Sequence, residues 1–163
     1  MDQEKHIEKM TEKEKARAVN YGLKLLTARQ RTEKEMADKL KEKNYSDEIV
    51  QYVLAYLKNY CYLDDQKYVE LYLREKININ RYGTIKLRNK LFQKGISSEL
   101  IAVGLDSIDE EKILENAVYL ADRKIKSLKH DEYMTIKQKV YRHLVSKGYS
   151  YATIVKALNI VVF

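Results

Sequence analysis

A seven-residue segment that occurs three times along the chain constrains its fold more than any other feature. The three copies read LKEKNYS at 40–46, LFQKGIS at 91–97 and LVSKGYS at 144–150, so that they start 51 and 53 residues apart. Recurrence at a nearly constant period indicates that one supersecondary unit is used repeatedly. We therefore expect three tandem units of roughly 50 residues each.

Each copy predicts the end of one helix, a corner and the start of the next helix. A lysine in the last turn suits the negative end of the helix macrodipole. The following residue falls where the backbone must turn left-handed, and the serine two positions later suits an N-cap. The predicted left-handed residues are Asn44, Gly95 and Gly148, and the predicted N-caps are Ser46, Ser97 and Ser150.

Two helices precede the corner in each unit, the second of which ends at it. Thr32 to Glu35 has the form of a capping box that opens the middle helix of the first unit, and Gly83-Thr84 and Asp131 mark the corresponding starts in the others. The first helices are expected at 11–28, 64–79 and 109–128, the earliest of them opened by a capping box at Thr11. Each unit is thus predicted to be three helices.

The chain contains no proline and only five glycines, so almost nothing interrupts helical hydrogen bonding. We expect an all-α fold of three tandem three-helix repeats that form an elongated, curved body. A charged lead-in at 1–15 precedes repeats expected at 16–60, 61–108 and 109–163.

No apolar stretch approaches the ~18 residues of a membrane span, and the first residues are charged, which favours a cytoplasmic protein without membrane contact. Cys61, the only cysteine, has no second thiol for a disulfide or a metal site, and we expect it to be a packing residue in a reducing compartment.

Catalysis has little support in the sequence. Asp64 and Asp65 are adjacent at a helix start, which favours capping over acid-base chemistry. The histidines lack the spacing of metal ligands, and no glycine-rich phosphate loop occurs, so we expect neither a cofactor nor an enzyme. Most of the fourteen tyrosines should pack on helix faces, but Tyr82 and Tyr141 lie next to basic residues and could stack on bases.

Basic residues gather in two stretches of the chain. Between 74 and 94 seven basic residues stand against one acid, and no acid occurs between 137 and 156. Lys86, Lys90 and Lys94 fall on one helical face, which suits phosphate contact, although a merely solvated face has the same pattern. The candidate binding residues are Arg74, Lys76, Arg81, Lys86, Arg88, Lys90, Lys94, Lys137, Lys139, Arg142 and Lys147.

About residues 16 to 160 resemble the RecX regulatory proteins, bacterial modulators of the RecA recombinase. The resemblance rests on segments of all three units, in the order and near the spacing of the family. They are Arg31-Thr32-Glu33 with Glu35 and Lys39-Leu40; Tyr62-Leu63-Asp64-Asp65, Tyr68-Val69, Tyr72, Arg74, Tyr82-Gly83 and Lys94-Gly95-Ile96-Ser97; and Arg123-Lys124, Tyr141-Arg142 and Gly148-Tyr149. The chain departs from the family at Cys61, where glycine is common, at Thr84, where proline is frequent, and at Tyr68, which replaces a phenylalanine.

The resemblance implies three three-helix units and no catalytic residues. It also implies a function in DNA repair, recombination and the SOS response: a monomer that lodges in the RecA filament on single-stranded DNA and inhibits its ATPase, strand-exchange and co-protease activities. Binding to single-stranded DNA alone is expected to be weak. Two alternatives remain, a stand-alone helical nucleic-acid-binding regulator and a helical scaffold without a DNA role.

Overall fold

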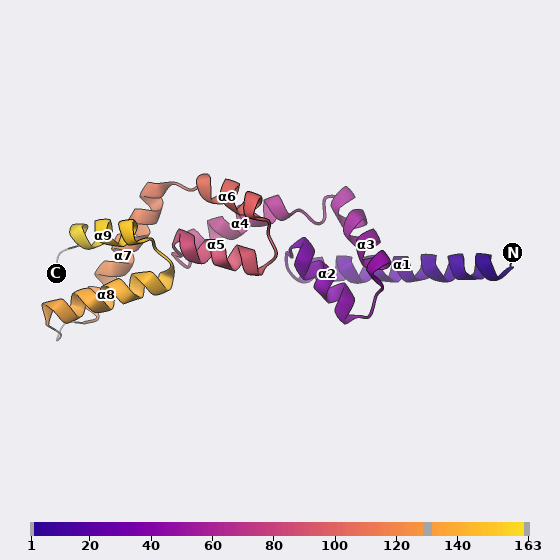
Figure 1. The fold of residues 1–163 in the computed structure, drawn as a ribbon, viewed down its shortest axis with the longest axis horizontal. Coiled ribbons are helices and arrows are strands. Elements are labelled where there is room, and N and C mark those ends of the chain that lie inside the picture. Colours follow the sequence, from indigo (N-terminus) through magenta and orange to yellow (C-terminus); the bar gives the residue numbers. More distant parts are fainter. Residues whose placement is uncertain (1, 129–131, 162–163) are drawn as a thin grey trace. The chain divides into compact units, whose positions relative to one another are not determined.

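The computed structural model describes residues 2–128 and 132–161, and within these ranges the chain forms nine α-helices and no strand (Figure 1). The predicted all-α class is therefore confirmed. The helices are α1 (Asp2–Ala28), α2 (Glu33–Glu42), α3 (Asp47–Asn59), α4 (Asp65–Asn78), α5 (Thr84–Gln93), α6 (Ser98–Asp106), α7 (Glu110–Lys126), α8 (Tyr133–Lys147) and α9 (Tyr151–Ile160). None of the described helices is both long enough and apolar enough to cross a membrane.

All three repeated corners have the predicted geometry. The φ angles of Asn44, Gly95 and Gly148 are 62°, 80° and 88°, in the left-handed region. The serine side chain that follows each corner accepts a hydrogen bond from the backbone N–H three residues later, as an N-cap does; the three caps are Ser46, Ser97 and Ser150. Local cap chemistry thus ends one helix and starts the next in each repeat.

The expected start of the first helix is wrong. Helix α1 begins at Asp2, so that Thr11 lies inside it instead of capping it. The residues before Thr11 include neither glycine nor proline, and most are good helix formers, so the helix continues through them. The expected cap at Asp131 lies outside the described residues, and α8 has Glu132 as its N-cap without a side-chain hydrogen bond.

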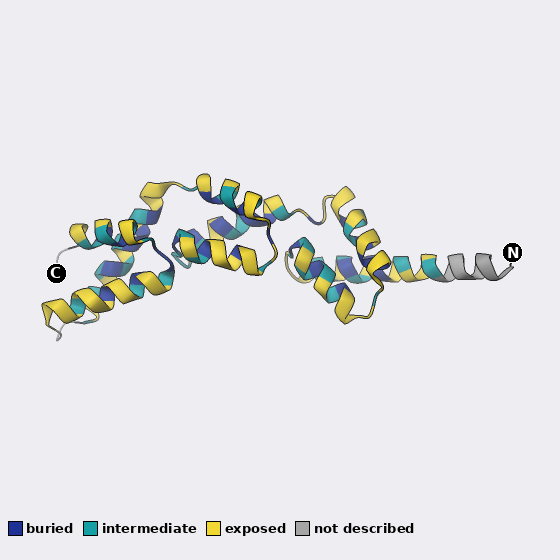
Figure 2. Ribbon diagram, viewed as in Figure 1, coloured by how far each residue is buried: buried dark blue, intermediate teal, exposed yellow. Residues whose placement is uncertain are grey.

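The chain divides into two compact units, and the first consists of Met1–Tyr68 together with Lys94–Ile96. Its core joins apolar residues of α1, α2 and α3, with Leu63 from the segment that follows (Figure 2). Met36, Leu40, Val50, Val53 and Leu57 are fully buried there. These residues recur at helical spacing, so each helix turns one apolar stripe toward the other two.

The second unit consists of Val69–Gln93 and Ser97–Phe163 and thus holds most of the second repeat and all of the third. A buried hydrogen bond links α4 and α7: Asn116 Nδ2 of α7 donates to the Ile77 carbonyl oxygen near the end of α4, at 3.0 Å. The Tyr149 hydroxyl donates to the Arg81 carbonyl oxygen at 2.7 Å. Both bonds supply partners to carbonyl groups that lie at or beyond a helix end.

Two glycines allow close backbone contact inside this unit. The Gly83 N–H donates to the Lys147 carbonyl oxygen at 2.9 Å, and the Ile85 N–H donates to the Gly148 carbonyl oxygen at 3.0 Å. A Cβ atom on Gly83 would collide with the backbone of Gly148. The corner of the third repeat therefore lies directly on the start of α5, and we call this contact the glycine joint.

Candidate binding surface

The basic residues of α4 and the following turn differ in how far they are engaged. Arg74 is exposed. Lys76 forms an ion pair with Glu75 at 2.6 Å and lies over the ring of Tyr72. Arg81 is half-buried, and its guanidinium lies 4.1 Å from the ring centroid of Tyr119. Of these three cations, Arg74 alone has no partner among the described residues.

In α5, the exposed residues Arg88 and Lys90 have no hydrogen bond or ion pair among the described residues. Lys86 is different, because its Nζ donates to the Ser146 carbonyl oxygen at 3.0 Å. This bond links α5 to the last turn of α8, next to the glycine joint. A groove lined by Lys86, Asn89, Lys90 and Ser146 runs along the same place.

The ring of Tyr82 brings the two basic stretches together. The Nζ atoms of Lys86 and Lys147 lie 4.6 and 5.8 Å from its centroid. Cations over an aromatic face are attracted by the ring quadrupole. Tyr82 therefore holds lysines of α5 and α8.

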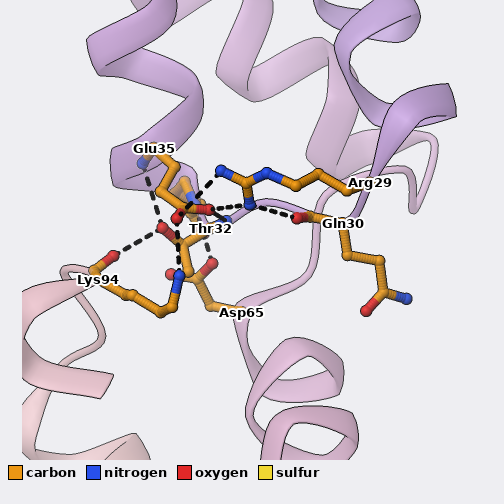
Figure 3. A network of polar contacts seen from close by, with 7 residues as sticks. Arg29, Gln30, Thr32, Glu35, Asp65 and Lys94 are labelled. Carbon is orange, nitrogen blue, oxygen red and sulfur yellow. Dashed lines mark hydrogen bonds and ion pairs between the residues drawn. The ribbon is translucent and has the colours of Figure 1, made fainter. Parts of the chain in front are cut away.

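Lys94 belongs to a polar network of the first unit, on the N-terminal end of α2 (Figure 3). Its Nζ forms an ion pair with Glu35 at 2.9 Å, and its carbonyl oxygen accepts a hydrogen bond from the Thr32 hydroxyl at 2.7 Å. Thr32 and Glu35 also complete the predicted capping box, which is confirmed. Arg29 adds a second cation to Glu35, at 3.1 Å.

The pKa of Glu35 reflects this network. Burial opposes ionisation, but hydrogen bonds from Lys94 and Arg29 outweigh it and lower the pKa of Glu35 below its ordinary value. Burial likewise acts against the charge on Lys94, and the hydrogen bonds to Glu35 and Tyr68 outweigh it, so that the pKa of Lys94 is raised. Of the three lysines expected to form a stripe, only Lys90 has no partner among the described residues.

Helix α8 carries the predicted basic residues of the third repeat. Lys137, Lys139 and Arg142 are exposed, and Lys137 and Arg142 border an almost wholly apolar hollow with Met134 and Tyr141. Farther along the helix, the pKa of His143 is lowered by burial and by the positive charges of Lys147 and Lys124. The two lysines thus add positive charge around the end of α8, although burial is the larger cause of the lowered pKa.

One basic residue with a well-defined contact, Arg123, was not among the candidate binding residues predicted from the sequence. It lies 5.9 Å from the ring centroid of Tyr119, on the same ring as Arg81, and its Nη1 donates to the Tyr119 hydroxyl at 3.4 Å. The signal was present in the sequence, because residues four apart on a helix are neighbours. Two guanidinium groups therefore meet at one tyrosine in the second unit.

The acidic pair lacks the arrangement of a catalytic site. Asp64 accepts a hydrogen bond from the Lys67 N–H at 3.0 Å, which confirms it as the cap of α4. Asp65 accepts one from the Glu33 N–H at 2.9 Å, and burial raises the pKa of Asp65. Each carboxylate thus binds a helix start. In the described part of the chain, no three histidine, cysteine or acidic side chains are grouped to hold a metal ion.

Comparisons with known proteins agree on one family. Three family models, described as the first, second and third three-helix domains of RecX, match residues 18–57, 64–105 and 110–158. The Regulatory protein RecX of Clostridium botulinum (strain Alaska E43 / Type E3) is 38% identical over 132 residues, which cover 80% of this chain and 61% of the relative. That of Clostridium perfringens (strain SM101 / Type A) is 34% identical over 153 residues, 93% of this chain and 71% of the relative.

Two solved structures have the same fold. The crystal structure of RecX from Lactobacillus salivarius matches with a TM-score of 0.83 and 26% identity, over 89% of this chain and 94% of that one. A second crystal structure of a regulatory protein RecX matches with a TM-score of 0.86 and 29% identity, over 92% of this chain and 75% of that one. The chain spans about six-tenths of the length of the Clostridium botulinum relative.

Proposed function

The chain belongs to the RecX family, and from this premise we propose that it is a negative regulator of RecA that binds the RecA filament on single-stranded DNA. The relatives are named regulatory proteins, which supports action by binding instead of catalysis. In this proposal the bound chain inhibits the ATPase, strand-exchange and co-protease activities of the filament, by blocking its extension or promoting its disassembly.

The structural observation that supports the proposal is a set of exposed cations in the second unit. Five of the predicted binding residues are exposed and have no partner among the described residues: Arg74, Arg88, Lys90, Lys137 and Arg142. Exposed cations that have no internal acceptor can neutralise phosphates or acidic protein groups at little structural cost. We propose these five as the residues that contact the filament, with Lys139 beside them.

Five of the remaining predicted residues are engaged in contacts within their own unit. Lys86, Lys94 and Lys147 hold corners and helix starts in place, while Lys76 and Arg81 lie on tyrosine rings. Substitution of these residues should change stability as well as binding. The exposed five therefore give the cleaner test.

Co-sedimentation tests the proposal directly. The chain is mixed with RecA filaments assembled on single-stranded DNA, and in parallel with naked single-stranded DNA and with duplex DNA in the absence of RecA. We expect stoichiometric sedimentation with the filament and much weaker association with either DNA. Tight, sequence-dependent binding to the duplex alone would instead favour a stand-alone nucleic-acid-binding regulator.

A further inference from the structure

A small pocket in the first unit is bordered by an arginine whose Nε has no acceptor among the described residues. It lies between the end of α1 and the start of α4 and is lined by Gln30, Arg31, Cys61, Tyr62, Asp64 and Lys67, among others. Arg31 is half-buried, and its Nε is shut off from solvent without a hydrogen-bond partner among the described residues. A buried donor without a partner needs an explanation, and an acceptor bound in the pocket beside the guanidinium would provide one.

The charges around the pocket suit an anion. Lys67 is exposed and brings a second positive charge. The one acid in the lining, Asp64, is already engaged in capping α4, whose positive end faces the same place. An arginine fork beside a lysine is a typical arrangement for binding a phosphate group.

Aromatic rings lie at the edge of this pocket. Tyr60 and Tyr62 are 62% and 57% exposed, and their rings stack at 6.4 Å between centroids with 29° between planes. The ring centroid of Tyr56 lies 4.6 Å from that of Tyr60, so that three tyrosine rings lie in a row. Cys61 has a φ of 58°, and this left-handed residue brings the tyrosines on either side of it together. Tyr62 belongs to this row of rings and also lines the pocket.

We propose that this place is a binding site for single-stranded nucleic acid, in which Arg31 and Lys67 hold a backbone phosphate and Tyr60 and Tyr62 stack on the neighbouring bases. Stacking rings beside cations form the usual surface for unpaired strands, whose bases are free to leave the stack. The site belongs to the first unit, whereas the exposed cations proposed above belong to the second, and its use does not require RecA. It therefore goes beyond the proposed regulatory function.

The sole cysteine provides a test that needs no substitution. Cys61 lines the pocket and is exposed, so N-ethylmaleimide should alkylate it. We expect saturating oligothymidylate to slow this alkylation severalfold, while an abasic oligomer of equal length protects less and inorganic phosphate protects least. Equal rates with and without oligothymidylate would overturn the proposal. Equal protection by all three ligands would overturn the stacking of bases.

Affinity measurements with variants provide a second test. Fluorescence anisotropy of labelled oligothymidylate, without RecA, should show about tenfold weaker binding for Tyr60→Leu and for Tyr62→Leu. Arg31→Gln and Lys67→Ala should weaken binding and reduce its salt dependence. Tyr151→Leu and Lys24→Ala are matched controls, because both residues are exposed and lie outside the pocket. Affinities equal to those of the controls would contradict the site.

The outcome is separable from that of the proposed function. If the chain binds oligothymidylate through this pocket but does not bind RecA filaments, the site stands and the regulatory proposal fails. If it binds filaments while Tyr60→Leu and Tyr62→Leu bind oligothymidylate as the unsubstituted chain does, the site fails alone.

Discussion

At the scale of single residues, the three corner positions all have a left-handed φ but differ in their surroundings. Asn44 is exposed, and its left-handed φ is a conformation that asparagine tolerates. A Cβ on Gly95 would collide with the side chain of Lys34, including its Cβ, whereas one on Gly148 would collide with the backbone of Lys86 as well as with its Cβ. The need for glycine therefore increases from the first corner to the third.

This gradient predicts the effect of alanine at the three corners. Asn44→Ala should cost about 1 kcal/mol of unfolding free energy, since alanine is strained in the left-handed region. Gly95→Ala should cost somewhat more, and Gly148→Ala about 3 kcal/mol or more, because backbone atoms would have to move. Urea denaturation followed by circular dichroism measures the order. Equal losses at Asn44 and Gly148 would contradict the steric account of the glycine joint.

Glu35 provides a pH-dependent prediction. Its pKa is lower in the folded chain than its ordinary value of 4.5, so its stabilising contribution is present above that value and is lost as the pH falls through the folded pKa. Glu35→Gln should cost about 1–2 kcal/mol at neutral pH and almost nothing in strong acid. Denaturation midpoints of both proteins over this pH range test the sign. A cost that stays constant into acid would contradict it.

Cys61 shows why a single residue can be misread from sequence. We expected it to be a packing residue, but it is exposed, with a φ of 58° at the end of α3. Glycine is common at such a position because it has no Cβ penalty there. The comparison with the family pattern indicated a left-handed position, because Cys61 stands where glycine is common. The residue type alone indicated a place in the core.

At the scale of helices, the start of α5 explains a second departure from the family pattern. Thr84 is the first residue of α5, and the hydrogen bonds of the glycine joint use the N–H groups of Gly83 and Ile85, on either side of it. Proline is well suited to the first position of a helix, where its missing N–H is not needed. The geometry at Thr84 is thus compatible with the proline that is frequent there.

Proline substitutions at neighbouring positions should therefore have opposite effects. Thr84→Pro should leave stability unchanged or raise it by about 0.5 kcal/mol, because it restricts the unfolded chain. Ile85→Pro removes the donor to the Gly148 carbonyl and should cost about 2 kcal/mol or more. Thermal denaturation of both variants distinguishes them. A marked loss for Thr84→Pro would show that the N–H of Thr84 has a role that the joint does not explain.

Most helix boundaries and caps, apart from the start of α1, could be predicted from the sequence because they depend on residues a few positions apart. The serine caps, the Thr32 capping box and the left-handed corners are all confirmed. Contacts between distant residues could not be predicted, such as the Thr32 hydroxyl on the Lys94 carbonyl, because sequence spacing does not report which repeats pack together. Those contacts decide which lysines are engaged in the fold.

At the scale of the whole molecule, basic residues alone do not define the binding surface. Lys86, Lys94 and Lys147 are engaged in internal contacts, while Arg88 and Lys90 have no such partner among the described residues. The net charge of +7 favours association with polyanions in general. Specific recognition must come from the exposed residues and their placement.

Neutralising the exposed cations of the second unit should therefore separate binding from folding. The triple variant Arg74→Gln, Arg88→Gln, Lys90→Gln should retain the helical content and stability of the unsubstituted chain, with filament binding at least tenfold weaker and less dependent on salt. A triple variant at Lys13, Arg17 and Lys24 of α1 removes the same charge and serves as the control. Equal losses in both variants would assign the effect to net charge alone.

The central claim, that this chain regulates RecA by binding its filament, is tested most directly by the ATP hydrolysis of RecA on single-stranded DNA. The purified chain is titrated into preformed filaments and into filaments that are still extending, and the steady-state rate is followed. We predict that hydrolysis declines at amounts stoichiometric with RecA or below and that added salt weakens the inhibition. An unchanged rate at a clear excess of the chain, with the protein shown to be folded, would contradict the claim.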